Sequence, residues 1–345
     1  MPHPQRTFWM LFSISVILLI LSIIVAVAIG AVPLPLSLVV SIISHELWPT
    51  ITPHWSVADS QIVLQFRLPR VLVAAVVGAA LAVSGTTLQA MVRNPLADPY
   101  IFGISSGASV AAVAVLTLGI GFTGIPVSFA AFIGALTTMA VVYGFAQHQG
   151  HVTPLRLILA GVAIGYLLSA VTSYLVLRAS TPGMGATAAL SWLAGSLGNA
   201  KWEHLGIPTL VLFTTTSYLL VHAATLNALA TGEETAITLG IDIERIRIRL
   251  FIATSLLVGT AVAISGAIGF VGLLIPHMIR MLVGASHQRV LPLAALIGAS
   301  FLVLVDVIGR IIIAPQELPV GLVTAACGAP FFLWLMRHHL QARQS

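Results

Sequence analysis

Long uncharged apolar runs alternate with short polar breaks along the chain, and this pattern predicts an all-α polytopic membrane protein. A helix rises 1.5 Å per residue, so an apolar run of about 20 residues crosses the hydrocarbon of a bilayer. The ten runs cover residues 8–30, 71–92, 99–119, 126–146, 155–177, 204–222, 250–267, 270–284, 290–313 and 319–336. The run at 270–284 is short and contains Pro276, which indicates a broken or partial span. We expect one transmembrane domain, residues 1–345, of about ten helices.

Composition supports the membrane class and narrows the chemistry. The chain is 58% hydrophobic and 7% charged, whereas soluble domains carry roughly 25% charged residues. The single cysteine, Cys327, excludes an intramolecular disulfide and a cysteine-ligated metal cluster. The first apolar run is longer than the core of a signal peptide, so we expect an uncleaved first span.

Basic residues set the expected orientation. With the N-terminus inside, ten spans place both termini in the cytoplasm, and ten of the 15 Lys and Arg residues then lie inside. The five outside are Arg67, Arg70, Arg178, Lys201 and Arg310. Because they oppose the positive-inside rule, we expect some to be functional. Asp306 and Arg310 are spaced i,i+4, so we expect them to pair near the outer boundary.

An internal repeat relates the second and seventh spans. Residues 77–85 match residues 258–266 at an offset of 181, which also pairs Pro95 with Pro276. Two such spans cross the membrane in opposite directions, and inverted repeats with corresponding helix breaks are typical of transporters. The expected halves are about 62–178 and 246–338. Ala74, Gly78 and Ala82 form a small-residue stripe that lets another helix approach closely.

The inside segment 223–249 has helical periodicity broken at Gly232 and Gly240. It predicts two short amphipathic helices at the membrane surface, with an apolar stripe of Leu226, Leu229 and Ala230. The alternative is a solvated connector. The segment 179–203, with Thr181 to Gly185, receives no assignment.

Motifs of catalysis and nucleotide binding are missing. The only lysine, Lys201, is followed by Trp202, so no Gly-Lys-Ser/Thr phosphate loop exists. Residues 103–107 fit G-x-S-x-G, but a catalytic serine there needs a strand-turn-helix context, so we expect a helix start. His277 can ligate a metal or haem, although a lone histidine in a span more often bonds a neighbouring helix. We predict no catalytic residue and no metal site.

Four stretches together resemble the FecCD family, the permeases of bacterial ABC importers for iron-siderophores, haem and cobalamin. They are residues 67–108, residues 232–240, Ser265 to Arg280, and Glu317 to Phe332. The resemblance covers nearly the whole chain. It implies ten spans per subunit and a homodimer, or paired permeases, around one pathway in the bacterial inner membrane. Two ABC ATPase subunits would dock inside, and a periplasmic or lipid-anchored substrate-binding protein outside. ATP and Mg²⁺ would lie on the ATPase, leaving no cofactor in this chain and no nucleic acid among its partners.

The resemblance also assigns residues. Arg67, Arg70 and Arg310 match arginines that pair with acidic residues of the binding protein; anchoring to lipid head groups is the alternative. The ATPase-coupling residues are Leu226, Leu229, Gly232, Glu233, Glu234, Thr235, Leu239 and Gly240. The gate and pathway residues are Asn94, Pro95, Ser105, Ser106, Gly161, Gly165 and Ser169.

The favoured cargo is an iron chelate, with a ferric siderophore ahead of haem or cobalamin. A proton-coupled secondary transporter would need buried carboxylates across the membrane, and an intramembrane hydrolase would need a polar catalytic pocket. Neither is visible, so both are less favoured.

Overall fold

Helices make up nearly all of the described chain. The computed structural model describes residues 4–30, 32–48, 54–118, 126–148, 151–179 and 185–342. Ten of its helices coincide with the ten predicted runs. They are α1 Pro4–Ala28, α4 Leu68–Val92, α5 Ile104–Thr117, α6 Val127–Ala146, α7 Pro154–Arg178, α9 Gly206–Val221, α12 Ile243–Ser265, α13 Val271–Val283, α14 His287–Ile311 and α15 Val320–Ala342. The predicted fold class is confirmed.

Seven described helices are long and apolar enough to cross a membrane, judged by length and composition. They are α1, α4 with the turns before it, α6, α7, α9 with the turn before it, α12 and α14. Helices α5, α13 and the apolar part of α15 are shorter. The prediction that 270–284 is a partial span agrees with the 13 residues of α13, which contain Pro276.

Short elements lie between these helices or next to their ends. They are α2 Leu36–Leu47, α3 Val57–Gln61, the π-helix η1 Ile62–Arg67, the 3₁₀ turn η2 Pro99–Phe102, β1 Gln147–His148 paired with β2 His151–Val152, α8 Gly185–Leu193, the 3₁₀ turn η4 Trp202–His204, α10 Ala223–Thr231 and α11 Glu233–Thr238. Helix α2 lies between the first two predicted spans, where the apolar stretch is too short to cross a membrane but long enough to form a helix. Thr181 to Met184 lie outside the described residues.

One long helical stretch, α3–η1–α4, forms the axis of the bundle. It begins at a capping box between Ser56 and Asp59. Pro69 lies inside this stretch and lacks the N–H that would continue the helical hydrogen bonds, and the carbonyl oxygen of Leu64, one turn earlier, accepts from Trp202 Nε1 at 2.8 Å. The stretch runs for 36 residues and ends at Arg93, whose φ of 53° breaks the helix. The π winding of η1 widens the helix over the six residues that end at Arg67.

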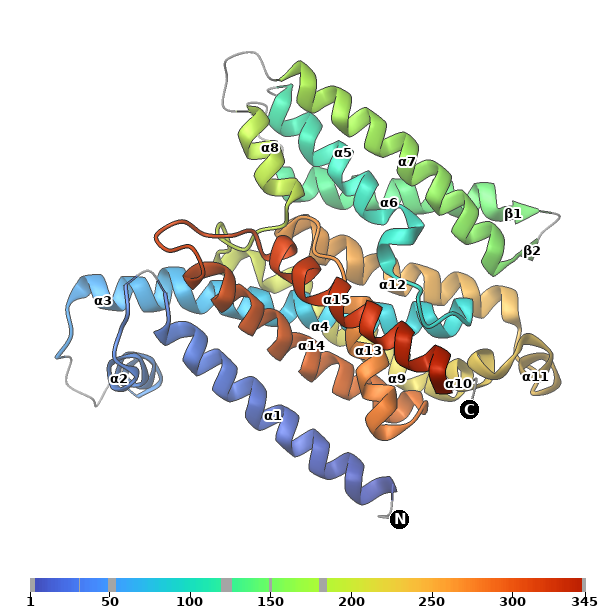
Figure 1. Ribbon diagram of the computed structural model, residues 1–345, viewed down its shortest axis with the longest axis horizontal. Coiled ribbons are helices and arrows are strands. Elements are labelled where there is room, and N and C mark those ends of the chain that lie inside the picture. The colour runs from blue at the N-terminus through green and yellow to red at the C-terminus, as the bar shows by residue number, and fades with distance from the viewer. Residues whose placement is uncertain are drawn as a thin grey trace.

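Small residues bring the backbones of α4 and α14 into contact. A Cβ on Gly78 would lie 2.2 Å from the carbonyl oxygen of Gly298, and a Cβ on Gly298 would lie 2.5 Å from the Cβ of Ala82. The predicted small-residue stripe is therefore a packing surface for α14, and Figure 1 shows the two helices side by side in the middle of the molecule.

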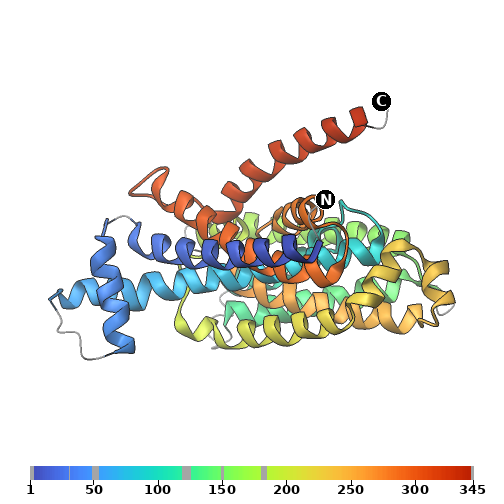
Figure 2. The same ribbon diagram turned by 90° about the horizontal axis from the view of Figure 1, so that it is seen from below.

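The two copies of the repeat run in opposite directions, as predicted. Arg93 ends α4 and Arg247 lies near the start of α12, yet both contact Glu233. Beyond the two matching helices, the repeat in the sequence is not a repeat in the structure. Pro95 and Pro276 correspond in the sequence, but Pro95 lies between helices and Pro276 lies inside α13. Both chain ends lie at the end of the bundle that carries α11, opposite α2 and α3, and α15 leans away from the other helices (Figures 1 and 2). We call these the α11 end and the α3 end.

Candidate functional site

Helices α10 and α11 confirm the prediction of two short helices in segment 223–247. Gly232, with a φ of 153°, separates them, and Gly240, with a φ of 77°, follows the second. Leu226 and Leu229 are buried, because this face of α10 packs against α4 and α14. These two leucines therefore hold α10 on the bundle and are not available to a partner, which corrects the expectation that they contact an ATPase.

The accessible part of the segment is α11 and the residue pair after it. Glu234, Thr235 and Gly240 are exposed, Ile237 is 62% exposed and Leu239 is 66% exposed. We call these five residues the α11 surface. Two exposed apolar side chains beside an acidic one form a compact patch of the kind used for protein contacts.

Glu233 differs from its neighbour Glu234. Its carboxylate lies 2.8 Å from Arg247 Nη2 and 3.6 Å from Arg93 Nη2. It therefore fastens α11 to α12 and to the end of α4, while Glu234 faces outward.

A set of hydrogen bonds that the sequence did not reveal joins α10 to the start of α14. Asn227 Oδ1 accepts from the backbone N–H of His287 at 2.9 Å and lies 2.7 Å from its ring Nδ1. Asn227 Nδ2 donates to Gln288 at 3.0 Å. Asn227 thus caps α14 from a distant part of the chain, and no local spacing could have indicated it.

The predicted gate residues lie in the turn after α4 and in the first turn of α5. Asn94 Oδ1 accepts from the backbone N–H of Leu96 at 2.9 Å and shapes the turn that contains Pro95. Ser105 is buried in the first turn of α5, and Ser106 lies near Gly165. Asp98 caps η2 by accepting from the N–H of Tyr100 at 2.9 Å, and burial raises the pKa of Asp98 to about 6.

The predicted pathway residues on α7 fall on two faces. A Cβ on Gly161 would lie 2.5 Å from the carbonyl oxygen of Ile101, so only a glycine at this position allows α7 to contact η2 this closely. Gly165 lies against Gly103 in the same contact. Ser169 is exposed instead, on the broad open face of α7 that also carries Tyr166. Only the Ser169 face is open to a pathway, and α7 lies at one edge of the bundle (Figure 1).

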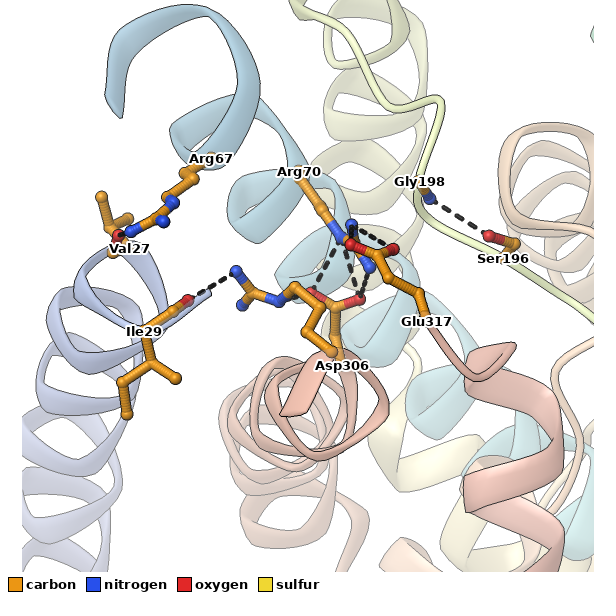
Figure 3. A network of polar contacts seen from close by, with 9 residues as sticks. Val27, Ile29, Arg67, Arg70, Ser196, Gly198, Asp306 and Glu317 are labelled. Atoms are coloured by element: carbon orange, nitrogen blue, oxygen red, sulfur yellow. Dashed lines mark hydrogen bonds and ion pairs between the residues drawn. The ribbon is translucent and has the colours of Figure 1, made fainter. Parts of the chain in front are cut away.

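At the α3 end, Arg67 and Arg310 both reach the end of α1. Arg67 Nη1 donates to the carbonyl oxygens of Val27 at 2.9 Å and Ala28 at 2.8 Å, and its Nη2 donates to Val32. Arg310 Nη1 donates to Ile29 at 3.0 Å. The last carbonyls of a helix lack intrahelical partners and carry partial negative charge, so two guanidinium groups satisfy them (Figure 3).

Arg70 joins α4 to α14 and to the turn before α15. Its Nε and Nη2 donate to Asp306, with the shortest contact at 2.8 Å, and its Nη1 donates to Glu317 at 2.8 Å (Figure 3). The predicted pair of Asp306 and Arg310 is confirmed, at 3.2 Å. Asp306 is completely buried, whereas the Glu317 side chain is 43% exposed.

The expectation that the three arginines face outward is not met. Arg67 is 8% exposed and Arg310 is 4% exposed, and Arg70 is engaged by two carboxylates of its own chain. The physical reason is that a buried charge must be neutralised or hydrogen-bonded, and here α1 and α14 supply the partners. Among the described residues, no group of three His, Cys, Asp or Glu side chains is placed to hold a metal ion.

Residues 18–338, nearly the whole helical bundle, match the FecCD transport family. The chain belongs to the FecCD transport family. Within the family, it is 42% identical to the cobalamin import system permease protein BtuC of Halobacterium salinarum, over 84% of this chain and 79% of that protein. It is 40% identical to the hemin transport system permease protein HmuU of Yersinia pestis, over 88% of this chain and 90% of that protein. This FecCD chain is thus an ABC importer permease, a transport component rather than a catalytic one.

Solved structures agree with the family assignment. A structure described as a metal-chelate type ABC transporter in an inward-facing conformation matches with a TM-score of 0.82 and 33% identity, over 97% of this chain and 100% of that one. PsaBC from Streptococcus pneumoniae, solved with a Fab, matches with a TM-score of 0.53 and 16% identity, which shows a shared fold alone.

Proposed function

We propose that this FecCD permease carries an iron chelate, a ferric siderophore first, across the cytoplasmic membrane. The observation that carries the proposal is the match over 97% of the chain to a protein described as a metal-chelate transporter. Haem or cobalamin is the second candidate, because relatives about 40% identical are named for those cargoes.

We propose that two permease chains pair along the open face of α7. Only 17% of the apolar window of this helix is buried inside the chain, while Gly161 fixes its other face on η2. A pathway between two copies would be lined by the face that carries Ser169 and Tyr166. Mostly apolar walls suit a bulky, rigid chelate that must be released again.

The partners we propose follow from the two ends of the bundle. An ATPase subunit holding ATP and Mg²⁺ would dock on the α11 surface of each copy, which makes the α11 end cytoplasmic and places both termini inside. A substrate-binding protein would dock at the α3 end. Because Arg67 and Arg310 are turned inward, the accessible charges there include Glu317 and the neighbouring Lys201 and Glu203, whose side chains are each 69% exposed.

The test is uptake into proteoliposomes that contain the permease, the ATPase that co-purifies with it, and the binding protein. The probes are a radio-iron-labelled hydroxamate siderophore, haemin and cyanocobalamin, each with and without ATP inside. ATP-dependent uptake of the ferric siderophore alone supports the first candidate. Uptake of haemin or cyanocobalamin alone establishes the second. ATP hydrolysis by the purified permease without its partner would contradict the proposal that ATP is hydrolysed on a separate subunit.

A further inference from the structure

Arg247 lies near the start of α12 and is almost completely enclosed. Its side chain is 4% exposed, whereas Arg245 and Arg249 on the same turn are exposed. Burying a guanidinium group is costly unless charged or hydrogen-bonding partners surround it. Its position is therefore defined by what it contacts.

Those contacts come from two separate elements beyond α12. Arg247 Nη2 lies 2.8 Å from Glu233 on α11, and Nη1 donates to the backbone carbonyl of Val152 on β2. On α12 itself, Glu244 lies 3.7 Å from Nη1 and adds a second carboxylate. The two ends of one planar group thus hold two segments 81 residues apart in the sequence.

The segment held at Val152 leads directly into α7. Thr153 follows it and accepts from the N–H of Arg156, which starts the helix at Pro154. Val152 itself is 1% exposed, so β2 is fixed in the bundle at this point. A displacement of Arg247 therefore acts on the first turn of α7.

The segment held at Glu233 is the accessible one. Helix α11 has only six residues, carries the α11 surface and contacts the bundle mainly through α10 and the start of α12. Glu233 is the charged residue that connects α11 to α12. A partner that displaces α11 therefore exerts force on Arg247 through the Glu233–Arg247 ion pair.

We propose that Arg247 is a positioning residue of the transport cycle: it joins α11 to β2 and the start of α7, so that movement of α11 is passed to α7. The inference rests on the proposed function, because it takes a cytoplasmic ATPase as the source of the movement. The planar guanidinium group is essential to it, since an ammonium group does not present two fixed donors to two segments.

The experiment uses the complex of the permease with its ATPase in nanodiscs, in a Cys327→Ser background. Spin labels are placed in pairs, Thr238 with Ala285 and Gln147 with Ala285, so that α11 and the β1–β2 turn are each measured against the end of α13. All three positions are exposed in the chain. Distances are compared without nucleotide and with ATP and vanadate. The variants are Arg247→Met, Arg247→Lys and Glu233→Gln, and the matched control is Arg249→Met.

In the native sequence and in Arg249→Met, we expect both distances to change on trapping. In Arg247→Met and Arg247→Lys, the change at Thr238 persists and the change at Gln147 is lost, while uptake per ATP hydrolysed falls at least about fivefold. Glu233→Gln keeps the side-chain shape and one hydrogen bond, so it tests the same contact even if the Arg247 variants misfold. It should show a partial loss of the distance change at Gln147.

Retention of both distance changes and of normal uptake per ATP in Arg247→Met would overturn the inference while leaving the proposed function intact. Loss of both changes in Arg249→Met as well would also overturn it, because the effect would then not depend on the buried contacts. If the native permease binds no ATPase and shows no change at either pair, the proposed function and the inference both fail.

Discussion

Replacing Asp306 by asparagine should destabilise the permease strongly. The carboxylate is completely buried and accepts hydrogen bonds from Arg70, while Arg310 lies 3.2 Å away. Asparagine has nearly the same shape, so the substitution removes the charge and little else. It leaves the Arg310 guanidinium group buried without its carboxylate partner.

The expected cost follows from the burial. Removing one partner of a buried ion pair costs about 3–5 kcal/mol, because the remaining charge stays desolvated. Arg70 keeps Glu317 at 2.8 Å, which favours the lower part of that range. Removing the stranded charge as well, in Asp306→Asn with Arg310→Met, should recover about 1 kcal/mol or more, as expected for residues in one network.

The measurement is equilibrium unfolding in mixed dodecyl maltoside and SDS micelles, followed by circular dichroism. The matched control is Asp242→Asn, which removes an exposed pair with Arg245 at 2.9 Å but keeps the helix cap. Its expected cost is about 0–1 kcal/mol. If Asp306→Asn costs no more than Asp242→Asn, or if the double variant is less stable than the single one, the network does not stabilise the α3 end as described.

Three further predictions concern other parts of the chain. Gly85→Ala should lower the unfolding temperature, because its Cβ would lie 2.0 Å from the carbonyl oxygen of Gly272, whereas Gly144→Ala meets no atom within 4 Å and should be neutral or slightly stabilising. Leu239→Ser should weaken co-purification of the ATPase roughly tenfold, while Glu234→Ala should chiefly change its salt dependence; equal effects would contradict the α11 surface. Asp98→Asn should flatten the pH dependence of stability: the raised pKa of about 6 means that the Asp98 contribution is present below about 4 and lost as the pH rises through 6. Identical melting profiles of the two proteins between pH 4 and pH 7 would refute the last.

The sequence predicted the seven long apolar helices well because membrane insertion imposes one strong rule. Every helix that crosses hydrocarbon must be apolar over about 20 residues, so its position can be read from the chain alone. The same rule explains what it missed: α2 and α8 are apolar but too short to cross, and the pattern does not say where such segments go.

The roles of charged residues were harder to predict. Arg67, Arg70 and Arg310 were correctly grouped at one end. Apart from Asp306, which pairs with Arg310 on the same helix, their partners lie 35 to 281 positions away, at the end of α1 and just after it, on α14 and in the turn before α15. Sequence spacing reveals a pair such as Asp306 and Arg310 on one helix and not a contact between helices. In the sequence, Arg245, Arg247 and Arg249 are three basic residues at alternate positions, and only the fold distinguishes the buried Arg247 from Arg249.

The π-helical winding of η1 makes this part of the chain tolerant of a change of one residue in length. A π-helical turn corresponds to one residue added to an α-helix, and the wider turn absorbs that residue. Deleting one residue between Ile62 and Phe66 would restore α-helical winding, and α3 would keep nearly its present orientation about the helix axis. The helix from Arg70 onward, with its contacts to α14, would keep its register. Relatives that are one residue shorter at this point would therefore present nearly the same face of α3 to a docking protein, with an ordinary α-helix in place of η1.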